Sequence, residues 1–472
     1  MSEQRKENPL GSAPVAKLMV KFAVPSIVAM LVGALYNIVD QFFIGQAVGK
    51  LGNAATNIAF PLSTSCIAIA LLFGIGGASC FNLHMGRGEK EKAAYYIGKA
   101  AVMLFSCGLV LCIISQVFLM PLLKGFGAPQ DVLPYAATYV RITSVGFPFL
   151  ILTTGGGHLI RADGRPKIAM ICNLTGAVIN TILDAIFVLK LNMGMAGAAY
   201  ATIIGQIISA AIVVWCLLHC KTVSLLGEHL KIRRSHAANA CADCPNYIRE
   251  IASLGMASFF NQIAMMIVQI VMNNSLKHYG ALSVYGDSTP LACAGIVMKV
   301  SQVFFSIVIG IGQGSQPIES FNYGAKKYDR VRETYRLAII AGGSISVLAF
   351  LMFQLFPRQI LAMFGKGDET YYQFGVEFFR IFLFFIWLNF MQPITSTFFT
   401  SIGKPIKGIF LSMTRQILFL LPLIMLLPLF MGIKGIIYAG PISDLMAGVA
   451  AIIMARLEFR EIQRLQKELA AR

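Results

Sequence analysis

The sequence predicts an all-α integral membrane protein of twelve transmembrane helices, arranged as two six-helix lobes. Three observations predict this fold: the composition, the number of long apolar stretches, and an internal repeat of about half the chain length. Of the 472 residues, 57% are hydrophobic and only 13% are charged. Because a soluble domain has roughly a quarter of its residues charged, an ordinary water-soluble protein is excluded.

The apolar stretches define the individual helices. A helix needs about 20 predominantly apolar residues to cross a hydrocarbon core about 30 Å thick. In chain order, twelve such stretches cover residues 22–45, 59–83, 100–122, 135–160, 168–189, 195–218, 248–276, 291–318, 337–356, 372–402, 406–430 and 433–454. They do not alternate apolar and polar residues, which excludes an outer-membrane barrel. The first stretch is too long for a removable signal peptide and lacks a small-residue cleavage site.

The basic residues are distributed unevenly between the connections. With the N-terminus inside, the tails and the connections on that side carry 28 of the 39 Lys and Arg residues, whereas the outside connections and span ends carry nine. Lys and Arg in short loops stay on the cytoplasmic side. We therefore expect a multi-pass protein of the plasma (inner) membrane with both termini in the cytoplasm. The net charge of +17 then reports topology, and we expect no nucleic-acid partner.

Most of the first half of the chain recurs in the second half at an offset of 236 to 239 residues. Among the matches, Gly76, Ser79, Gly88, Gly164 and Pro166 recur as Gly312, Ser315, Gly324, Gly403 and Pro405. Each repeat holds six spans, an even number, so both halves insert the same way up and are related by an axis along the membrane normal. Two lobes of this kind with a cleft between them are typical of an alternating-access transporter.

The spans and the repeat predict four segments. They are an N-terminal six-helix lobe (1–220), a cytoplasmic linker (221–247), a C-terminal six-helix lobe (248–456) and a basic cytoplasmic tail (457–472). Cys241 and Cys244 in the linker form one CxxC motif, and without a second pair this motif does not predict a zinc site. We also find no P-loop, Ser-His-Asp or HExxH pattern. The sequence therefore predicts no metal site, no catalytic residues and no enzyme.

Three of the 22 acidic residues lie well inside apolar spans: Asp40, Asp184 and Asp444. The other acidic residues, Glu319 among them, are assigned to connections, tails or span ends. Ionisable side chains inside a span are functional candidates by default. Asp40 and Asp184 each lie about five residues, roughly 8 Å by helical rise, before the outer end of an outward-running span. We therefore expect both carboxyl groups at the same depth in the outer third of the N-terminal lobe.

Three further oxygen-bearing side chains fall at a comparable depth. Asn180 lies one turn before Asp184 on the same helix face, Tyr139 near the outer start of the fourth span, and Thr202 near the outer end of the sixth. Two nearby carboxylates in a low dielectric cannot both ionise cheaply, so the pair suits a proton. The same oxygens could instead coordinate sodium, or each acid could be a structural group bonded to a neighbouring helix.

Asp444 is not shared by the two lobes, because the residue 238 positions earlier is Gln206. It could attract a cationic substrate, or it could form an ion pair with Arg415 or Lys299. We favour the ion pair.

The sequence resembles the multidrug and toxic compound extrusion (MATE) family over nearly the whole chain. The resemblance is carried by Pro25, residues 36–45 (YNIVDQFFIG), 86–88 (GRG), 164–166 (GRP), 180–184 (NTILD) and 322–326 (NYGAK). It implies that Asp40, Asn180 and Asp184, with Tyr139 and Thr202 nearby, form the cation site of the N-terminal lobe. Relatives with a sodium site in the other lobe carry a Glu in the seventh span. Here residues 259–262 read FFNQ, so the resemblance favours coupling through the N-terminal lobe.

The resemblance implies a multidrug efflux antiporter that confers antibiotic resistance by exporting amphipathic, mostly cationic drugs and dyes in exchange for protons, or sodium. Candidate contacts for such xenobiotics are Tyr36, Asn37, Met256, Asn261 and Gln262. We expect no cofactor besides the coupling ion, and a monomer that contacts membrane lipids. The alternative is a lipid-linked oligosaccharide flippase of the same superfamily, whose pyrophosphate substrate needs a basic cavity, whereas only Lys299 and Arg415 lie inside spans. A channel or receptor is disfavoured by the two-lobe repeat.

Overall fold

The computed structural model describes residues 8–220, 246–286, 288–364 and 369–470, and these residues are almost entirely helical. The helices of the first half are α1 (Pro9–Ser12), α2 (Val15–Val48), α3 (Lys50–Arg87), α4 (Lys90–Val117), α5 (Leu119–Gly125), α6 (Leu133–Thr143), η1 (Ser144–Gly146), α7 (Phe147–Ala162), α8 (Pro166–Asp184), η2 (Ala185–Lys190) and α9 (Gly194–Leu218). Those of the second half are α11 (Tyr247–Ala281), α12 (Ser288–Gly324), α13 (Tyr328–Leu355), α14 (Pro357–Phe364), α15 (Glu369–Phe382), α16 (Ile386–Asn389), α17 (Met391–Ser401), α18 (Pro405–Met413), η3 (Thr414–Leu420), α19 (Leu421–Met431) and α20 (Ile433–Ala470). The predicted all-α class is confirmed for these ranges.

The number of spans agrees with the prediction. Within the described ranges, eleven helical segments are long and apolar enough to cross a membrane, and a bent pair makes a twelfth if it is counted as one span. The pair consists of residues Glu369–Phe382 and Ile386–Ser401, which meet at 40°. The prediction of one continuous helix over 372–402 is therefore wrong, because the tenth span consists of two helices with a break between them. The residues at the break are Leu and Phe, so no glycine or proline indicated it.

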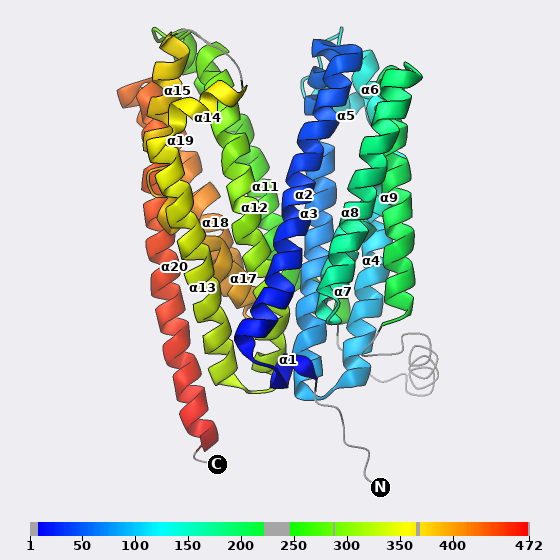
Figure 1. Cartoon of the computed structure of the whole chain (residues 1–472), viewed down its shortest axis with the longest axis vertical. Coiled ribbons are helices and arrows are strands. Elements are labelled where there is room, and N and C mark those ends of the chain that lie inside the picture. Colours follow the sequence, from blue (N-terminus) through cyan, green and yellow to red (C-terminus); the bar gives the residue numbers. More distant parts are fainter. Residues whose placement is uncertain (1–7, 221–245, 287, 365–368, 471–472) are drawn as a thin grey trace.

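The helices form two bundles that stand side by side, and Figure 1 shows the bundle of α2 to α9 beside that of α11 to α20. We call them the N-lobe and the C-lobe. Helix α3 packs against α11, and α2 packs against α12. The molecule has a terminal end, where α1 and the last turns of α20 lie, and a distal end, where α5 and α14 lie (Figure 1). The predicted linker falls almost wholly on residues 221–245, including Cys241 and Cys244, and these lie outside the described residues.

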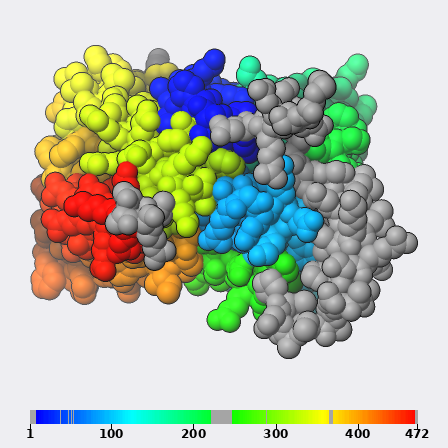
Figure 2. Space-filling view, turned by 90° about the horizontal axis from the view of Figure 1, so that it is seen from below, coloured from blue at the N-terminus to red at the C-terminus, as the bar shows by residue number. Residues whose placement is uncertain are grey.

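The lobes approach each other closely in the terminal half of the molecule. A Cβ atom added to Gly255 of α11 would overlap the carbonyl oxygen of Leu72 in α3, and one added to Gly324 of α12 would overlap that of Leu83. Glycine at such positions lets two helix backbones come together. The ribbons of the two lobes diverge toward the distal end in Figure 1, whereas Figure 2 shows the lobes abutting at the terminal end. The structure is therefore closed at its terminal end.

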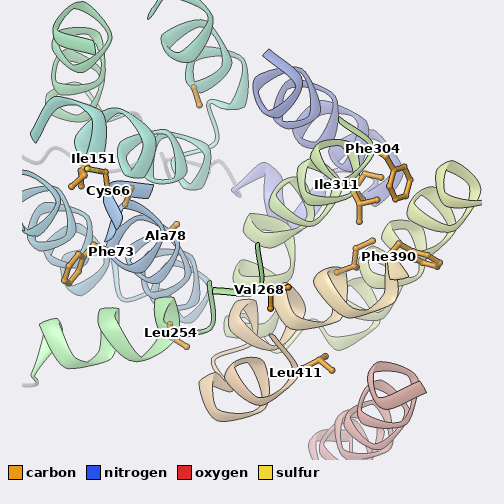
Figure 3. Close-up of a cluster of buried hydrophobic side chains, with 14 of the residues drawn as sticks. Cys66, Phe73, Ala78, Ile151, Leu254, Val268, Phe304, Ile311, Phe390 and Leu411 are labelled. Atoms are coloured by element: carbon orange, nitrogen blue, oxygen red, sulfur yellow. The ribbon is translucent and has the colours of Figure 1, made fainter. Parts of the chain in front are cut away.

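Buried apolar side chains form one cluster that extends through both lobes. Phe73 of α3 and Ile151 of α7 belong to the N-lobe part, and Phe304 of α12 and Phe390 belong to the C-lobe part (Figure 3). Leu254 of α11 lies beside the α3 part and joins the two.

Candidate cation site

Two buried carboxyl groups face each other in the N-lobe. Asp40 lies on α2 and is 8% exposed, and Asp184 is the last residue of α8 and is 0% exposed. Their carboxyl groups lie within hydrogen-bonding reach of each other. Each residue is near the end of its helix that points toward the distal end of the molecule. The structure thus brings together the two acids that the sequence places at the same depth.

Most of the carboxyl oxygens of this pair have no hydrogen-bond donor. Within the part of the chain that the structure describes, Oδ1 of Asp40 and both oxygens of Asp184 lack a partner, and no basic side chain acts on either acid. An ionised carboxylate only accepts hydrogen bonds, so two facing carboxylates cannot bond to each other. One shared proton would supply the donor and remove one of the two charges. A pair of this kind can hold a proton or another small cation.

Asn180 and Thr202 lie beside the pair and are joined to each other. The Nδ2 atom of Asn180 donates to Oγ1 of Thr202 at 3.2 Å, and this hydroxyl donates to the carbonyl oxygen of Ala198 at 3.0 Å. The close packing of α8 and α9 makes this contact, since a Cβ on Gly205 would lie only 2.8 Å from the carbonyl oxygen of Gly176. Both side chains are buried, and Oδ1 of Asn180 has no partner among the described groups.

Two tyrosines complete the cluster. Tyr139 of α6 lies within electrostatic range of Asp40, Asp184 and Tyr36. Tyr36, which lies one turn before Asp40 on α2, lies near Thr202. All five residues of the predicted cation site are thus gathered, and Tyr36, a candidate for drug contact, joins them. The set supplies carboxyl, amide and hydroxyl oxygens, which are the ligands that hard cations prefer.

The other candidate drug contacts are not part of this cluster. Met256, Asn261 and Gln262 lie half-buried on α11 in the C-lobe, and Asn261 is within 3.8 Å of the sulfur of Met265. No hydrogen bond links them to Asp40 or Asp184 in the described part of the chain. The side chain of Asn37 lies outside the described residues. The role of all four residues stays a prediction.

In the C-lobe, the buried acid Asp444 has a cationic partner. The Nε atom of Arg415 in η3 lies 2.6 Å from Oδ1 of Asp444 in α20, and Nδ2 of Asn389 donates to the same oxygen at 2.9 Å. The guanidinium of Arg415 also lies over the ring of Phe305, 5.7 Å from its centroid. The predicted ion pair of Asp444 is therefore confirmed, and Arg415 is the partner.

The sequence analysis placed Glu319 in the connection after the eighth span, and this assignment is wrong. Helix α12 continues to Gly324, and Glu319 lies inside it with 0% exposure. The repeat held a signal that could have shown this, because the residue 236 positions earlier is Leu83, which lies in the second apolar span and is buried in the structure. The described residues contain no group of three or more His, Cys, Asp or Glu that could hold a metal ion.

The chain matches known proteins over most of its length. A family model described as MatE matches residues 25–186 and 257–453. Among the curated relatives, the multidrug export protein MepA of Staphylococcus aureus (strain N315) is 22% identical over 445 residues and covers 94% of both chains. MepA of Staphylococcus haemolyticus (strain JCSC1435) is 25% identical over 355 residues, or 75% of each chain.

The fold also matches solved structures. One is described as the outward-facing conformation of a multidrug resistance MATE family transporter of the MOP superfamily; it has a TM-score of 0.86 at 20% identity and covers 96% of this chain and 98% of that one. Another is described as MATE in the straight conformation, with a TM-score of 0.87 over 97% of this chain and 98% of that one. At 20% identity these likenesses show the fold.

Proposed function

The chain belongs to the MatE family, whose members are membrane transporters and not enzymes, and we propose that it is a multidrug efflux antiporter. It exports amphipathic, mostly cationic small molecules and takes up protons in exchange. The observation that carries the proposal is the facing pair Asp40 and Asp184, buried without a basic partner in the described part of the chain. Such a pair can change its charge by one proton, which is what proton coupling requires.

The cycle follows from where this pair lies. In the state closed at the terminal end, a proton enters from the distal side and removes one of the two charges of the pair. Loss of charge lets α2 and α8 approach and weakens the attraction for a cationic drug, which leaves on the distal side. When the lobes part at the terminal end, the proton is released and the recharged N-lobe binds another drug molecule. The drug shifts the equilibrium between the state closed at the terminal end and the state open there, because it binds these two states with different affinity.

Three further features support the details of this proposal. The Lys and Arg bias puts the terminal end in the cytoplasm of a plasma-membrane protein. The relatives of the chain are named for multidrug export. The 22 Met and 34 Phe residues suit a cavity that repacks around varied apolar cations, because Met is flexible and aromatic faces attract cations. We expect a monomer that needs no cofactor besides its coupling ion and contacts lipid around its circumference.

We propose a proton as the coupling ion, because one proton supplies the hydrogen-bond donor that two facing carboxyl groups lack. Sodium is the alternative, since Oδ1 of Asn180 and the carboxyl oxygens of Asp184 have no partner among the described groups and could coordinate it. The flippase alternative loses support for a different reason. Arg415, one of two basic residues in the spans, is held by Asp444 and is not free to bind a pyrophosphate.

The test is dye efflux from proteoliposomes under an imposed proton gradient or an imposed sodium gradient, each in turn. We expect efflux with the proton gradient alone, and its loss to background in Asp40→Asn and in Asp184→Asn. Asp131→Asn, which changes an exposed carboxylate of the same lobe, is the matched control and should transport normally. Full efflux by both variants of the pair would overturn the proposal, and efflux driven by sodium alone would replace the proton with sodium.

The variants are expected to fold, which keeps this test decisive. In Asp184→Asn the new amide can donate to Oδ1 of Asp40, which has no donor among the described groups of the wild-type protein. Removing an unpaired buried charge is commonly neutral or stabilising. The melting temperature of the purified variant should therefore stay close to that of the wild type while energised efflux is lost.

A further inference from the structure

Glu319 is a second buried acid without a partner, and it lies in the C-lobe at the opposite end of the molecule from Asp40 and Asp184. It is 0% exposed and lies five residues before the last residue of α12, close to the terminal end. Neither carboxyl oxygen has a hydrogen-bond partner among the described groups. A carboxylate in such a place loses its hydration and gains no donor, so the charged form is strongly disfavoured.

The groups around Glu319 are hydroxyl oxygens and no cation. Ser315 of α12 and Ser401 of α17 lie beside its carboxyl, and neither is hydrogen-bonded to it. Both hydroxyls donate to helix carbonyl oxygens, Ser315 to Gly312 at 2.9 Å and Ser401 to Thr397 at 2.8 Å. Each could accept a hydrogen bond from a protonated Glu319 and keep its own bond, whereas donating to a carboxylate would break the bond to the helix carbonyl. This arrangement suits a protonated carboxyl group.

The neighbouring helices do not supply a charge to this site. Tyr335 of α13 is the titratable side chain of the described residues that faces Glu319, and its hydroxyl is bonded to Oγ1 of Thr395 at 2.9 Å. Helix α12 also packs against α1, α2, α3, α11, α14, α15 and α17, and no charged side chain among their described residues acts on the carboxyl. One carboxyl with two or three hydroxyl oxygens is too few ligands for sodium, which leaves a proton as the cation that fits.

The internal repeat shows that packing does not require an acid here. The same register that matches Ser79 with Ser315 and Gly88 with Gly324 places Leu83 opposite Glu319. Leu83 is buried in the apolar cluster of the N-lobe. On the facing helix the counterpart of Ser401 is Ala162, which is buried too. The N-lobe thus fills the equivalent place with apolar side chains, and the polar set is specific to the C-lobe.

Glu319 also lies between contacts that close the terminal end. On one side of it, Nε2 of Gln316 donates across the lobe interface to Oγ of Ser79 at 2.8 Å. On the other side, Nδ2 of Asn322 donates to the carbonyl oxygen of Leu10 in α1 at 2.9 Å. Separation of the lobes at this end breaks such contacts and opens this stretch of α12 to water. The carboxyl of Glu319 then becomes able to exchange its proton.

We propose that Glu319 is a second proton-binding site of this protein, which exchanges its proton with water on the terminal side only when the lobes part there. The proton binding itself rests on the structure alone. The gating rests on the alternating access of the proposed function. Together they give the C-lobe a titratable group near the terminal end, whereas the pair in the N-lobe serves the distal end.

The test of proton binding is infrared spectroscopy of the full-length protein in proteoliposomes at neutral pH. We expect a protonated-carboxyl C=O band that is lost in Glu319→Gln and kept in Glu369→Gln, an exposed glutamate of the same lobe. Glu319→Leu copies the residue of the other repeat, so it should fold and lose the same band. If Glu319→Gln and Glu319→Leu both keep every protonated-carboxyl band, Glu319 is ionised and the proposal is wrong. The spectrum requires no transport, so this result is independent of the Asp40 and Asp184 efflux test.

The test of gating is the rate at which the Glu319 band shifts after transfer to deuterated water. In a Ser79→Cys, Gln316→Cys double variant, a short reagent that links the two thiols holds the lobes together. We expect exchange to slow by about tenfold or more on linking, because the open state is removed. The same variant without the linker is the matched control. Equal exchange rates in the two forms would show that the proton reaches Glu319 without separation of the lobes.

Discussion

The Asp40 and Asp184 pair of the N-lobe and Asp444 of the C-lobe are buried in opposite ways. In the N-lobe, Asp40 and Asp184 face each other, and no basic side chain of the described residues is paired with them. In the C-lobe, Asp444 lies 2.6 Å from the guanidinium of Arg415 and accepts a second hydrogen bond from Asn389. Because the lobes are repeats of one fold, the contrast depends on a few side chains and not on architecture.

The contrast separates a variable charge from a fixed one. An arginine beside a buried carboxylate favours its charged form, since the guanidinium stays protonated and attracts the carboxylate. Two carboxyl groups that share a proton change their total charge when that proton leaves. The N-lobe can therefore respond to a proton gradient, whereas the Asp444 pair holds helices of the C-lobe together while the N-lobe changes.

The largest expected effect comes from breaking the fixed pair. Arg415→Met leaves Asp444 buried with Asn389 as its remaining described partner. Loss of one member of a buried ion pair destabilises a protein by about 3–5 kcal/mol. We expect a large fall in the melting temperature of the purified protein, measured by thermal unfolding in detergent.

The double variant Arg415→Met, Asp444→Asn is the control for this prediction. It removes both charges, and the new Asn can still accept the hydrogen bond from Asn389. We expect most of the stability to return and drug efflux to stay coupled to protons. If the double variant is stable but uncoupled, the Asp444 pair takes part in coupling and the contrast between the lobes fails.

A smaller effect is expected from the two asparagines that accompany the acids. Asn389 donates to the charged Asp444, whereas Asn180 donates to the neutral hydroxyl of Thr202. Hydrogen bonds to charged groups contribute about 1.5–3 kcal/mol, and neutral ones about 0.5–1.5 kcal/mol. Asn389→Leu should therefore lower the free energy of unfolding more than Asn180→Leu does, as measured by chemical denaturation. An equal or reversed order would show that the C-lobe acid is not the more strongly held one.

The spans were predictable from the sequence because bilayer thickness sets the length of an apolar helix. The break in the tenth span was not, since Leu and Phe at positions 383–385 give no signal for a bend. Glu319 was misplaced because the apolar stretch ends at Ile318, yet the helix continues to Gly324. That extension is covered by α1, with Asn322 bonded to Leu10, a contact between residues more than 300 positions apart. No local pattern reports such a contact.

The acids of the candidate site were found by a different kind of reasoning. Charged residues are expensive inside a span, so Asp40, Asp184 and Asp444 could be singled out without any knowledge of packing. The depth argument also anticipated which two lie together, because position along a helix converts directly into height in the membrane. The proximity of Tyr36 to Thr202 could not be derived from the sequence, because it depends on how α2 is rotated about its axis relative to α9.

The lobes also differ in the loops that follow their fourth helices. Gly164 and Gly403 occupy equivalent positions with φ of 81° and 78°, a left-handed conformation that favours glycine. The next residue is Arg165 in the N-lobe and Lys404 in the C-lobe. Arg165 pairs with its near neighbour Asp163 at 2.7 Å. Lys404 instead reaches α20, where its Nζ lies 2.6 Å from the fully buried Glu458.

The smallest expected effect comes from these two basic residues and depends on pH. Burial alone would lower the pKa of Lys404, but its hydrogen bonds to Glu458 and Glu461 outweigh burial and raise it. A raised pKa in the folded state means that Lys404 stabilises the protein below the ordinary lysine pKa of about 10.4, and that this contribution is lost as pH rises through the raised value. We expect Lys404→Met to be less stable than the wild type by about 1 kcal/mol near neutral pH, and the difference to shrink as pH rises through the raised pKa of Lys404. Arg165→Met is the matched variant, and because arginine stays charged over this range its difference from the wild type should not shrink. The measurement is the melting temperature of the wild type and of both variants across this pH range. If the stability differences of Lys404→Met and Arg165→Met from the wild type declined together, Lys404 would not be the group that titrates.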